Sequence, residues 1–206
     1  MTLSITQKVV RRARERGLTV IQRNQWGTVH EDIYQWRRQH KPHQLLPGKP
    51  VDTVWQHITV TVPSGDFRED CRVIERIGFE RFGTGCSYNF MVDMTTGHIG
   101  VGQPLDAKGA HTVNDKHIDG YSYDQNAVAI GIAVIGMPDT HLSAAATVAI
   151  ATLIAACMDV GAVTPDPDYV PHSLVAAKDC PCDSTRDAMP RILRLAQRLH
   201  PAGAHK

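Results

Sequence analysis

The sequence predicts an α/β fold in which a central β-sheet is covered by helices on both faces. Two observations favour this class. Short β-branched runs are interspersed with helix-forming segments along the chain, and residues 127–135 (AVAIGIAVI) form a nearly continuous apolar run of strand length. A strand without a polar side belongs at the centre of a sheet that is buried on both faces. The length of 206 residues suits one domain of ordinary size.

Five segments are expected to form helices. They are residues 4–16, 28–41, 68–82, 142–160 and 186–199. Gly17 stops the first helix and Gly161 the fourth, which is rich in alanine. Thr28 and Glu31 have the spacing of a capping box, in which each side chain satisfies a backbone amide at the start of a helix.

Five further segments are expected to form strands. They are residues 18–21, 54–62, 88–93, 98–101 and 127–135. Residues 54–62 are rich in β-branched side chains, which favours a buried strand. Residues 88–93 and 98–101 flank a glycine-containing turn and are expected to form a hairpin. Residues 102–124 and 164–168 (TPDPD) are rich in turn formers and are expected to be loops.

The composition excludes several classes of protein. An apolar fraction of 42% is too high for a disordered chain. The longest apolar-leaning run, residues 144–158, is shorter than the roughly 20 residues that a membrane span needs. Residues 1–17 contain no apolar core of the kind that a secretory signal has. We therefore expect a soluble globular protein without an export signal of its own.

Positive charge is concentrated near the N-terminus. Residues 1–50 carry ten lysines and arginines but three acidic residues. A basic helix within residues 1–17 is therefore expected to contact an anionic surface, either a cell wall or a membrane. The alternative is a helix that is solvated on its charged face and stabilises the fold or an oligomer. Nucleic acid is not expected as a partner, because no aromatic residue interleaves with residues 11–16 (RRARER).

Cysteine and histidine provide the candidate chemistry. Five cysteines without regular spacing predict no disulfide framework. His172 and Cys180 lie eight residues apart in a polar segment, and His57 lies in a predicted strand. Two histidines and one cysteine leave the fourth tetrahedral position of a zinc ion open, which is typical of a catalytic site. The spacing alone leaves open that His57 is a hydrogen-bonded core residue and Cys180 an inert loop residue.

Six segments, in order, resemble the zinc-dependent N-acetylmuramoyl-L-alanine amidases, the family that includes phage lysozyme-type amidases and peptidoglycan recognition proteins. They are residues 20–27 (VIQRNQWG), 54–59 (VWQHIT), 87–92 (SYNFMV), 109–111 (GAH), 125–131 (QNAVAIG) and 171–181 (PHSLVAAKDCP). The resemblance covers about residues 18–198. It implies a central mixed sheet with helices on both faces. It also implies a catalytic domain at residues 18–200, between the basic helix at 1–17 and a tail at 201–206.

The resemblance implies a role for six residues. Zinc would be held by His57, His172 and Cys180. Tyr88 and Lys178 match the family's two catalytic side chains. His111 matches a position that lines the substrate groove.

The sequence departs from the family's pattern at three places. Gln56 precedes His57 where the family commonly has two consecutive histidines. Cys182 follows the Cys-Pro pair where glycine or serine is frequent, and it is expected to point away from the metal. Residues 112–124 form a longer segment than is usual, so the substrate groove is expected to differ there.

The implied reaction is hydrolysis of the amide between N-acetylmuramic acid and L-alanine of the peptidoglycan stem peptide. Among family roles, a monomeric phage endolysin is favoured by the Lys-x-Cys-Pro segment at residues 178–181 and by the basic N-terminal half, which suits an anionic wall. Cys180 and the absence of an expected signal peptide disfavour a recognition protein. An endolysin waits in the host cytoplasm until a holin releases it to the cell wall. The alternatives are a cytoplasmic muropeptide-recycling amidase and a non-catalytic recognition module. A hydrolase with Cys180 as nucleophile is disfavoured, because such enzymes usually place the cysteine before the histidine.

Overall fold

A six-stranded sheet forms the centre of the computed structural model, which describes residues 2–41, 50–112, 124–176 and 179–200. The strand order is β1-β4-β3-β5-β2-β6. The strands are β1 (Val20–Ile21), β2 (Val51–Ile58), β3 (Phe90–Asp93), β4 (Ile99–Val101), β5 (Ala129–Ile135) and β6 (Val163–Pro171). Only the hairpin of β3 and β4 is antiparallel among these neighbours, so the sheet is mixed, as expected.

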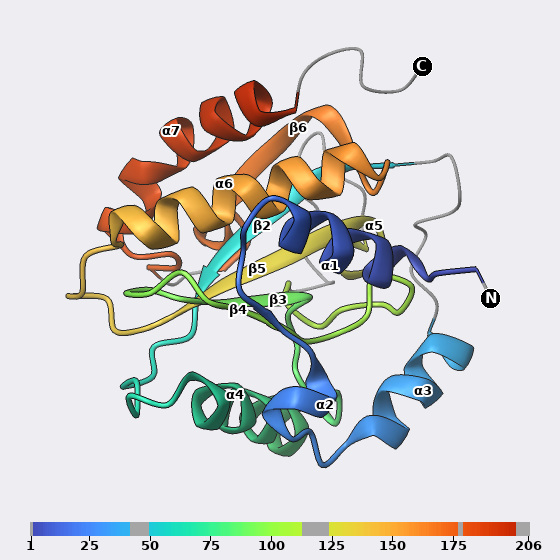
Figure 1. Ribbon diagram of the computed structural model, residues 1–206. Coiled ribbons are helices and arrows are strands. Elements are labelled where there is room, and N and C mark those ends of the chain that lie inside the picture. The colour runs from blue at the N-terminus through green and yellow to red at the C-terminus, as the bar shows by residue number, and fades with distance from the viewer. Residues whose placement is uncertain (1, 42–49, 113–123, 177–178, 201–206) are drawn as a thin grey trace.

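Helices cover both faces of this sheet, which confirms the predicted fold class (Figure 1). They are α1 (Ile5–Glu15), α2 (Arg23–Trp26), α3 (Glu31–His40), α4 (Phe67–Phe82), α5 (Gln125–Val128), α6 (Ala144–Asp159) and α7 (Asp183–Leu199), with a 3-10 helix at His172–Leu174. Helices α1, α6 and α7 lie on one side of the sheet and α2, α3 and α4 on the other (Figure 1).

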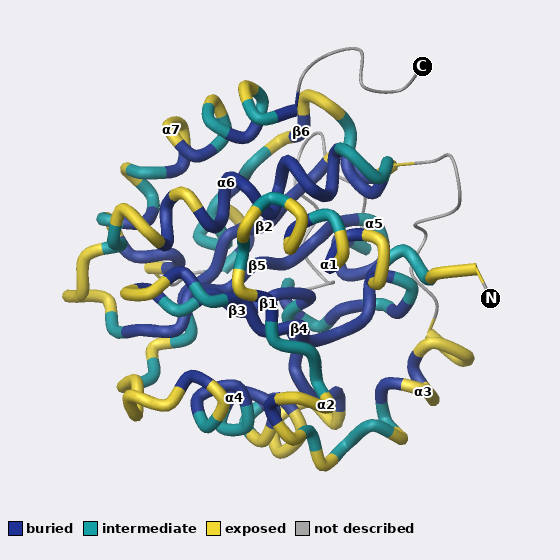
Figure 2. The backbone as a smooth tube through the Cα atoms, in the orientation of Figure 1, coloured by how far each residue is buried: buried dark blue, intermediate teal, exposed yellow. Residues whose placement is uncertain are grey.

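Strand alternation divides the side chains of β2 between these two faces. Val54 and Ile58 join the core that contains α1, α6 and α7. Trp55 packs instead in a separate small cluster with Ala129 and Val170. His57 follows Trp55 by two residues, and successive strand residues alternate between faces, so His57 lies on the face away from α6. Strands β2, β3 and β5 are buried over almost their whole length (Figure 2).

Helix α1 is part of the core. Ser4 caps it, and the side chains of Val9 and Ala13 are fully buried in the cluster that includes α6. Arg12 and Arg16 form ion pairs with Asp159 at the end of α6, each with a shortest N–O distance of 2.6 Å. The structure therefore gives α1 a role in stabilising the fold, on the face opposite His57, and a contact with an anionic surface stays a prediction for its exposed charges.

The predicted capping box at residues 28–31 is wrong. Helix α3 begins at Glu31, and its N-cap residue is His30. The Thr28 hydroxyl accepts a hydrogen bond from the backbone nitrogen of His30 at 3.3 Å and donates to the buried carboxylate of Glu75 on α4. The Glu31 carboxylate pairs with Arg23 in a two-bond ion pair. The reciprocal pair does not form, because Glu31 is held by Arg23, and the N-cap lies at His30, two residues after Thr28.

The predicted loop at residues 164–168 is also wrong, because these residues belong to β6. Pro165 and Pro167 suggested a loop, but β6 is the edge strand of the sheet, and proline is tolerated at a sheet edge, where one side of the strand needs no donor. The neighbouring strand β2 runs from Val51 to Ile58 and is shifted toward the N-terminus relative to the predicted 54–62. Within the described residues, no helix combines the length and apolar character that crossing a membrane requires.

Candidate metal centre

Three side chains converge at the end of strands β2 and β6. His57 lies near the end of β2, His172 directly follows β6, and Cys180 precedes α7. The ligand atoms of these three residues all lie within 4.8 Å of one another. Strands β2 and β6 are parallel neighbours, so their carboxyl ends meet at the same edge of the sheet. The structure thus brings together the three residues that the sequence proposed as metal ligands.

His57 is the most deeply buried of the three, with 1% of its surface exposed. Its Nε2 atom is buried and has no hydrogen-bond partner among the described residues. Burial, together with the charges of His172 and His111, holds the pKa of His57 well below its usual value. The neutral imidazole is the form that binds metal. A buried, neutral and unpartnered nitrogen beside a histidine and a thiol fits a metal ion in this position.

The other two ligand candidates are held by backbone contacts. The Sγ atom of Cys180 lies 3.4 Å from the backbone nitrogen of Ile58, which donates to it. The backbone nitrogen of Ser173 donates to the carbonyl of Cys180 at 2.5 Å, and this bond joins the segment after His172 to the segment that carries the cysteine. The rings of His57 and His172 have their centroids 4.5 Å apart. Backbone bonds therefore hold Cys180 against the end of β2 and against the segment after His172.

Cys182 does not belong to this cluster. It is the N-cap residue of α7 and is buried. Its sulfur lies 3.4 Å from Ser184 Oγ and 3.5 Å from Thr185 Oγ1, in the first turn of that helix. The expectation that Cys182 points away from the metal ligands is confirmed by these contacts.

Tyr88 lies beside the three ligand candidates. Its ring centroid is 5.1 Å from that of His57, with the rings tilted by 51°. Burial, with smaller contributions from the neighbouring Cys180 and Cys86, raises the pKa of the Tyr88 phenol above its ordinary value. The hydroxyl therefore keeps its proton at neutral pH and can serve as a hydrogen-bond donor.

A buried amide next to Tyr88 fixes its backbone. Asn89 Oδ1 accepts a hydrogen bond from the backbone nitrogen of Gly131 at 2.8 Å. Its Nδ2 atom donates to the carbonyl of Gln103 at 3.2 Å. The backbone nitrogen of Gln103 in turn donates to the carbonyl of Tyr88 at 2.7 Å. Asn89 thus connects the Tyr88 segment to strand β5 and to the segment after β4.

His111 packs edge-on against His57, with ring centroids 5.3 Å apart. Two glycines make room for its ring: a Cβ atom at Gly131 would fall 2.5 Å from the ring carbons of His111, and one at Gly109 would fall 2.6 Å away. Asn126 Oδ1 accepts a hydrogen bond from the backbone nitrogen of His111 at 2.7 Å. His111 is buried, with 4% of its surface exposed, and its ring lies against the first ligand candidate.

Lys178, the second residue expected to be catalytic, lies outside the described residues, as does most of the long segment at 112–124. The catalytic role of Lys178 stays a prediction. Sequence reasoning assigned no role to the buried amides Asn89 and Asn126, although both stand inside the family-like segments. The available indications were that Asn89 follows Tyr88 and that Asn126 directly precedes the apolar run at residues 127–135.

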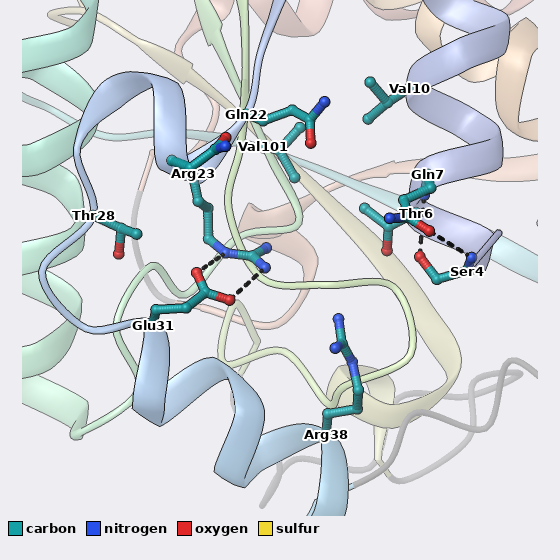
Figure 3. Close-up of a pocket in the computed structure, with 11 residues that line it drawn as sticks. Ser4, Thr6, Gln7, Val10, Gln22, Arg23, Thr28, Glu31, Arg38 and Val101 are labelled. Atoms are coloured by element: carbon teal, nitrogen blue, oxygen red, sulfur yellow. Dashed lines mark hydrogen bonds and ion pairs between the residues drawn. The ribbon is translucent and has the colours of Figure 1, made fainter. Parts of the chain in front are cut away.

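A separate polar pocket of about 620 Å³ lies between α1, α2 and α3 (Figure 3). Its charged and capping groups are already paired. Arg23 binds Glu31, Arg38 binds Asp106, and Ser4 and Gln7 cap one another. Because these polar groups already bind each other, the pocket has few hydrogen-bonding groups left for a ligand. The candidate site is therefore the cluster around His57.

Comparisons with known proteins identify the family of this chain. The family model of N-acetylmuramoyl-L-alanine amidases matches residues 47–183, and this range contains all six residues that the sequence proposed for the site. The chain therefore belongs to the N-acetylmuramoyl-L-alanine amidase family. A search of curated protein sequences found no significant match.

Solved structures of peptidoglycan recognition proteins have the same fold. Bumblebee PGRP-SA is 20% identical, with a TM-score of 0.65 over 81% of this chain and 90% of that chain. Drosophila PGRP-SA is 25% identical, with a TM-score of 0.63 over 80% of this chain and 86% of that chain. Human PGRP-IBETAC, solved in complex with glycosamyl muramyl pentapeptide, is 25% identical, with a TM-score of 0.60 over 80% and 90% of the two chains.

Proposed function

We propose that this protein is a zinc-dependent amidase that hydrolyses the bond between N-acetylmuramic acid and L-alanine of the peptidoglycan stem peptide. The observation that carries the proposal is the convergence of His57, His172 and Cys180 within 4.8 Å in a chain of the amidase family. The donor set of two imidazoles and one thiolate suits zinc and leaves one coordination position open, as catalytic zinc sites do. Bound zinc would supply Lewis acidity, which activates a water molecule and polarises the scissile carbonyl.

The protein's own side chains supply the rest of the chemistry. The Tyr88 hydroxyl retains its proton and lies next to the ligand cluster, so it orients the attacking water. It passes a proton to the leaving nitrogen of alanine and takes up the proton that the water loses, which restores the phenol. Lys178 supplies a cation for the negative charge that develops on the carbonyl oxygen. His111, whose ring packs against His57, is assigned to the substrate groove.

The alternative function is non-catalytic recognition of peptidoglycan. The matched structures are named as recognition proteins, and the human one was solved with a muramyl pentapeptide. A binder needs no metal, however, and has no use for a buried histidine nitrogen without a partner next to a second histidine and a thiol. The complete ligand set favours the enzyme.

Among amidases, we favour an endolysin that acts as a monomer on the bacterial wall. Its exposed basic residues near the N-terminus, Lys8 and Arg11, suit an anionic polymer. In this setting the enzyme accumulates in the cytoplasm of the host and reaches the wall after a holin opens the membrane. A cytoplasmic recycling amidase would share the chemistry but act on soluble muropeptides.

The test is zinc content measured together with hydrolysis of purified peptidoglycan. We expect about one zinc per chain, the count that one such ligand set predicts, and release of new amino termini. Substitution by His57→Ala, His172→Ala or Cys180→Ser should lower both quantities, whereas Cys182→Ser, a matched cysteine outside the cluster, should lower neither. Full zinc content in all three ligand variants would refute the centre. Zinc without hydrolysis, but with binding of a muramyl pentapeptide, would identify a recognition module.

A further inference from the structure

Gln56 lies directly behind the candidate metal centre. It precedes His57 on strand β2 and, because strand residues alternate, projects from the opposite face of the sheet. Its side chain is fully buried. A buried amide must have its donors and acceptor satisfied, since leaving them unpaired costs free energy.

The Gln56 amide is satisfied by groups from three strands. Its Nε2 atom donates to the carbonyl of His57 at 2.9 Å and to the carbonyl of Ile132, on β5, at 3.2 Å. Its Oε1 atom accepts a hydrogen bond from the Tyr169 hydroxyl, on β6, at 2.5 Å. One side chain therefore bonds to the main chain of a ligand candidate and connects it to both neighbouring strands.

The register of the sheet places this connection at the level of the ligands. Gln56 is opposite Ile132 on β5 and opposite Pro171 on β6. Pro171 immediately precedes His172, and Tyr169 lies three residues before it. The Tyr169–Gln56 bond thus joins β2, which carries His57, to β6, which ends directly before His172; it lies one residue from the first histidine and three from the second. Burial raises the pKa of Tyr169, so its hydroxyl remains a donor at neutral pH.

We propose that Tyr169 and Gln56 are positioning residues for the metal centre: their hydrogen bond fixes strand β6 against β2 and thereby sets the spacing of His57 and His172. This inference rests on the proposed function, because it assumes that the cluster binds zinc. Groups that orient metal ligands through hydrogen bonds typically change metal affinity by 10-fold to 100-fold when they are removed. Gln56 projects from the face opposite His57 and Tyr169 packs against the core that includes α6, so their effect passes through the ligands.

The decisive variant is Tyr169→Phe, which removes one hydroxyl and no packing atoms of the ring. The matched control is Tyr34→Phe, which removes another buried tyrosine hydroxyl, one that donates to Glu75 and accepts from the backbone nitrogen of Cys86. Three quantities are measured for each: the zinc dissociation constant by chelator competition, the absorption spectrum of the cobalt-substituted protein, and the melting temperature without metal. Gln56→Met and the double variant complete a double-mutant cycle.

We expect Tyr169→Phe to weaken zinc binding about 10-fold and to change the cobalt spectrum. Tyr34→Phe should lower the melting temperature but leave zinc affinity and the cobalt spectrum as in the parent. Adding Tyr169→Phe to Gln56→Met should weaken zinc binding no further, because the hydrogen bond is already absent. Parental zinc affinity in Tyr169→Phe, or additive losses in the cycle, would overturn the inference while leaving the zinc centre intact. A parent protein that binds no zinc would overturn the inference and the proposed function together.

Discussion

The rings of His57 and His172 lie 4.5 Å apart, centroid to centroid, at an angle of 48°. They come from distant parts of the chain and meet because β2 and β6 are parallel neighbours in the sheet. Two ligand candidates are thus supported by adjacent strands, while Cys180 comes from the segment before α7. A metal bound here would also join these segments, so removal of zinc is expected to lower the melting temperature as well as the activity.

Tyr88 is predicted to act in turnover rather than in metal binding. Tyr88→Phe keeps the ring next to His57 but removes the hydroxyl, so zinc content should be unchanged and kcat should fall about 100-fold. Lys178→Ala is expected to behave in the same way, because its proposed role is limited to the transition state. Steady-state kinetics on purified peptidoglycan, with zinc content measured on the same samples, tests both. A variant that digests peptidoglycan at the parental rate would remove that residue from the mechanism.

Gly131 is predicted to be required for the position of His111. In Gly131→Ala the new Cβ atom would fall 2.5 Å from the His111 ring, so the ring must move. Gly100→Ala is a suitable control, because its Cβ would meet Cys71 Sγ at 2.6 Å, on the side of α4. Each should cost about 1–3 kcal/mol of unfolding free energy through overpacking.

The two glycine variants should differ in catalysis. Gly131→Ala is expected to raise KM for peptidoglycan or to lower kcat, while Gly100→Ala should leave both unchanged at a temperature where it is folded. Equal kinetics in the two variants would mean that His111 serves packing alone.

Asp159 is predicted to stabilise the protein in a pH-dependent manner. Burial alone would raise its pKa, but hydrogen bonds from His200, Arg12 and Arg16 outweigh that effect and lower it. A lowered pKa means that the stabilisation is complete above the unfolded-state value of about 3.9 and is lost as pH falls through the lower folded value. Asp159→Asn should therefore lower the free energy of unfolding by about 2 kcal/mol at pH 7.

This cost should shrink as the pH falls below 4, because protonation then removes the same charge from the parent. Urea unfolding of parent and variant at neutral and acidic pH measures the difference. Asp168→Asn, at an exposed carboxylate on β6, provides the control. A difference between parent and Asp159→Asn that is constant with pH would contradict the assignment.

Basic residues of α1 and its C-cap Arg16 differ in their surroundings and in their predicted effects. Arg12 and Arg16 pair with Asp159, whereas Lys8 and Arg11 are exposed, and Arg11 pairs with the exposed Glu15 at 3.6 Å. Replacing Lys8 and Arg11 by glutamine should weaken adsorption to cell walls at low salt, and the difference should vanish at high salt, because exposed charges are screened within about 10 Å at 0.1 M salt. Melting temperature and hydrolysis of soluble muropeptides should not change.

A chain that begins at Leu18 is expected to behave differently, because it loses the buried Val9 and Ala13 as well as the partners of Asp159. It should melt at a lower temperature than the parent.

Wall pull-down across a salt series compares the Lys8 and Arg11 charge variant with the parent. Equal adsorption at every salt concentration would leave α1 with its structural role alone.

Much of the fold could be predicted from local pattern. The continuous apolar run predicted the interior strand β5, and the alanine-rich segment predicted α6. Both predictions succeeded because an apolar pattern depends directly on burial. The edge strand β6 was missed, because Pro165 and Pro167 suggest a loop unless the strand is known to have a free side. The position of a strand in a sheet is a property of the whole fold and cannot be found in five residues.

In the site, too, some residues could be predicted from the sequence and others could not. The ligand candidates were found from residue type, order and resemblance, and the structure brings them together. The Tyr169–Gln56 bond could not be found, because Tyr169 lies directly after the segment that was expected to be a loop, and no local pattern pairs it with a glutamine on β2. Supporting contacts of this kind depend on strand register, which the sequence does not state.

Product analysis of a defined muropeptide tests the central claim most directly. The zinc-loaded protein is incubated with a muramyl pentapeptide, and the products are identified by mass spectrometry. The account predicts two products whose masses sum to that of the substrate plus one water: a saccharide with a free lactyl carboxylate and a pentapeptide with a free amino group on L-alanine. Both should disappear when zinc is chelated and return when zinc is restored. A substrate that is bound but recovered intact, or one that is cut at any other bond, would contradict the account.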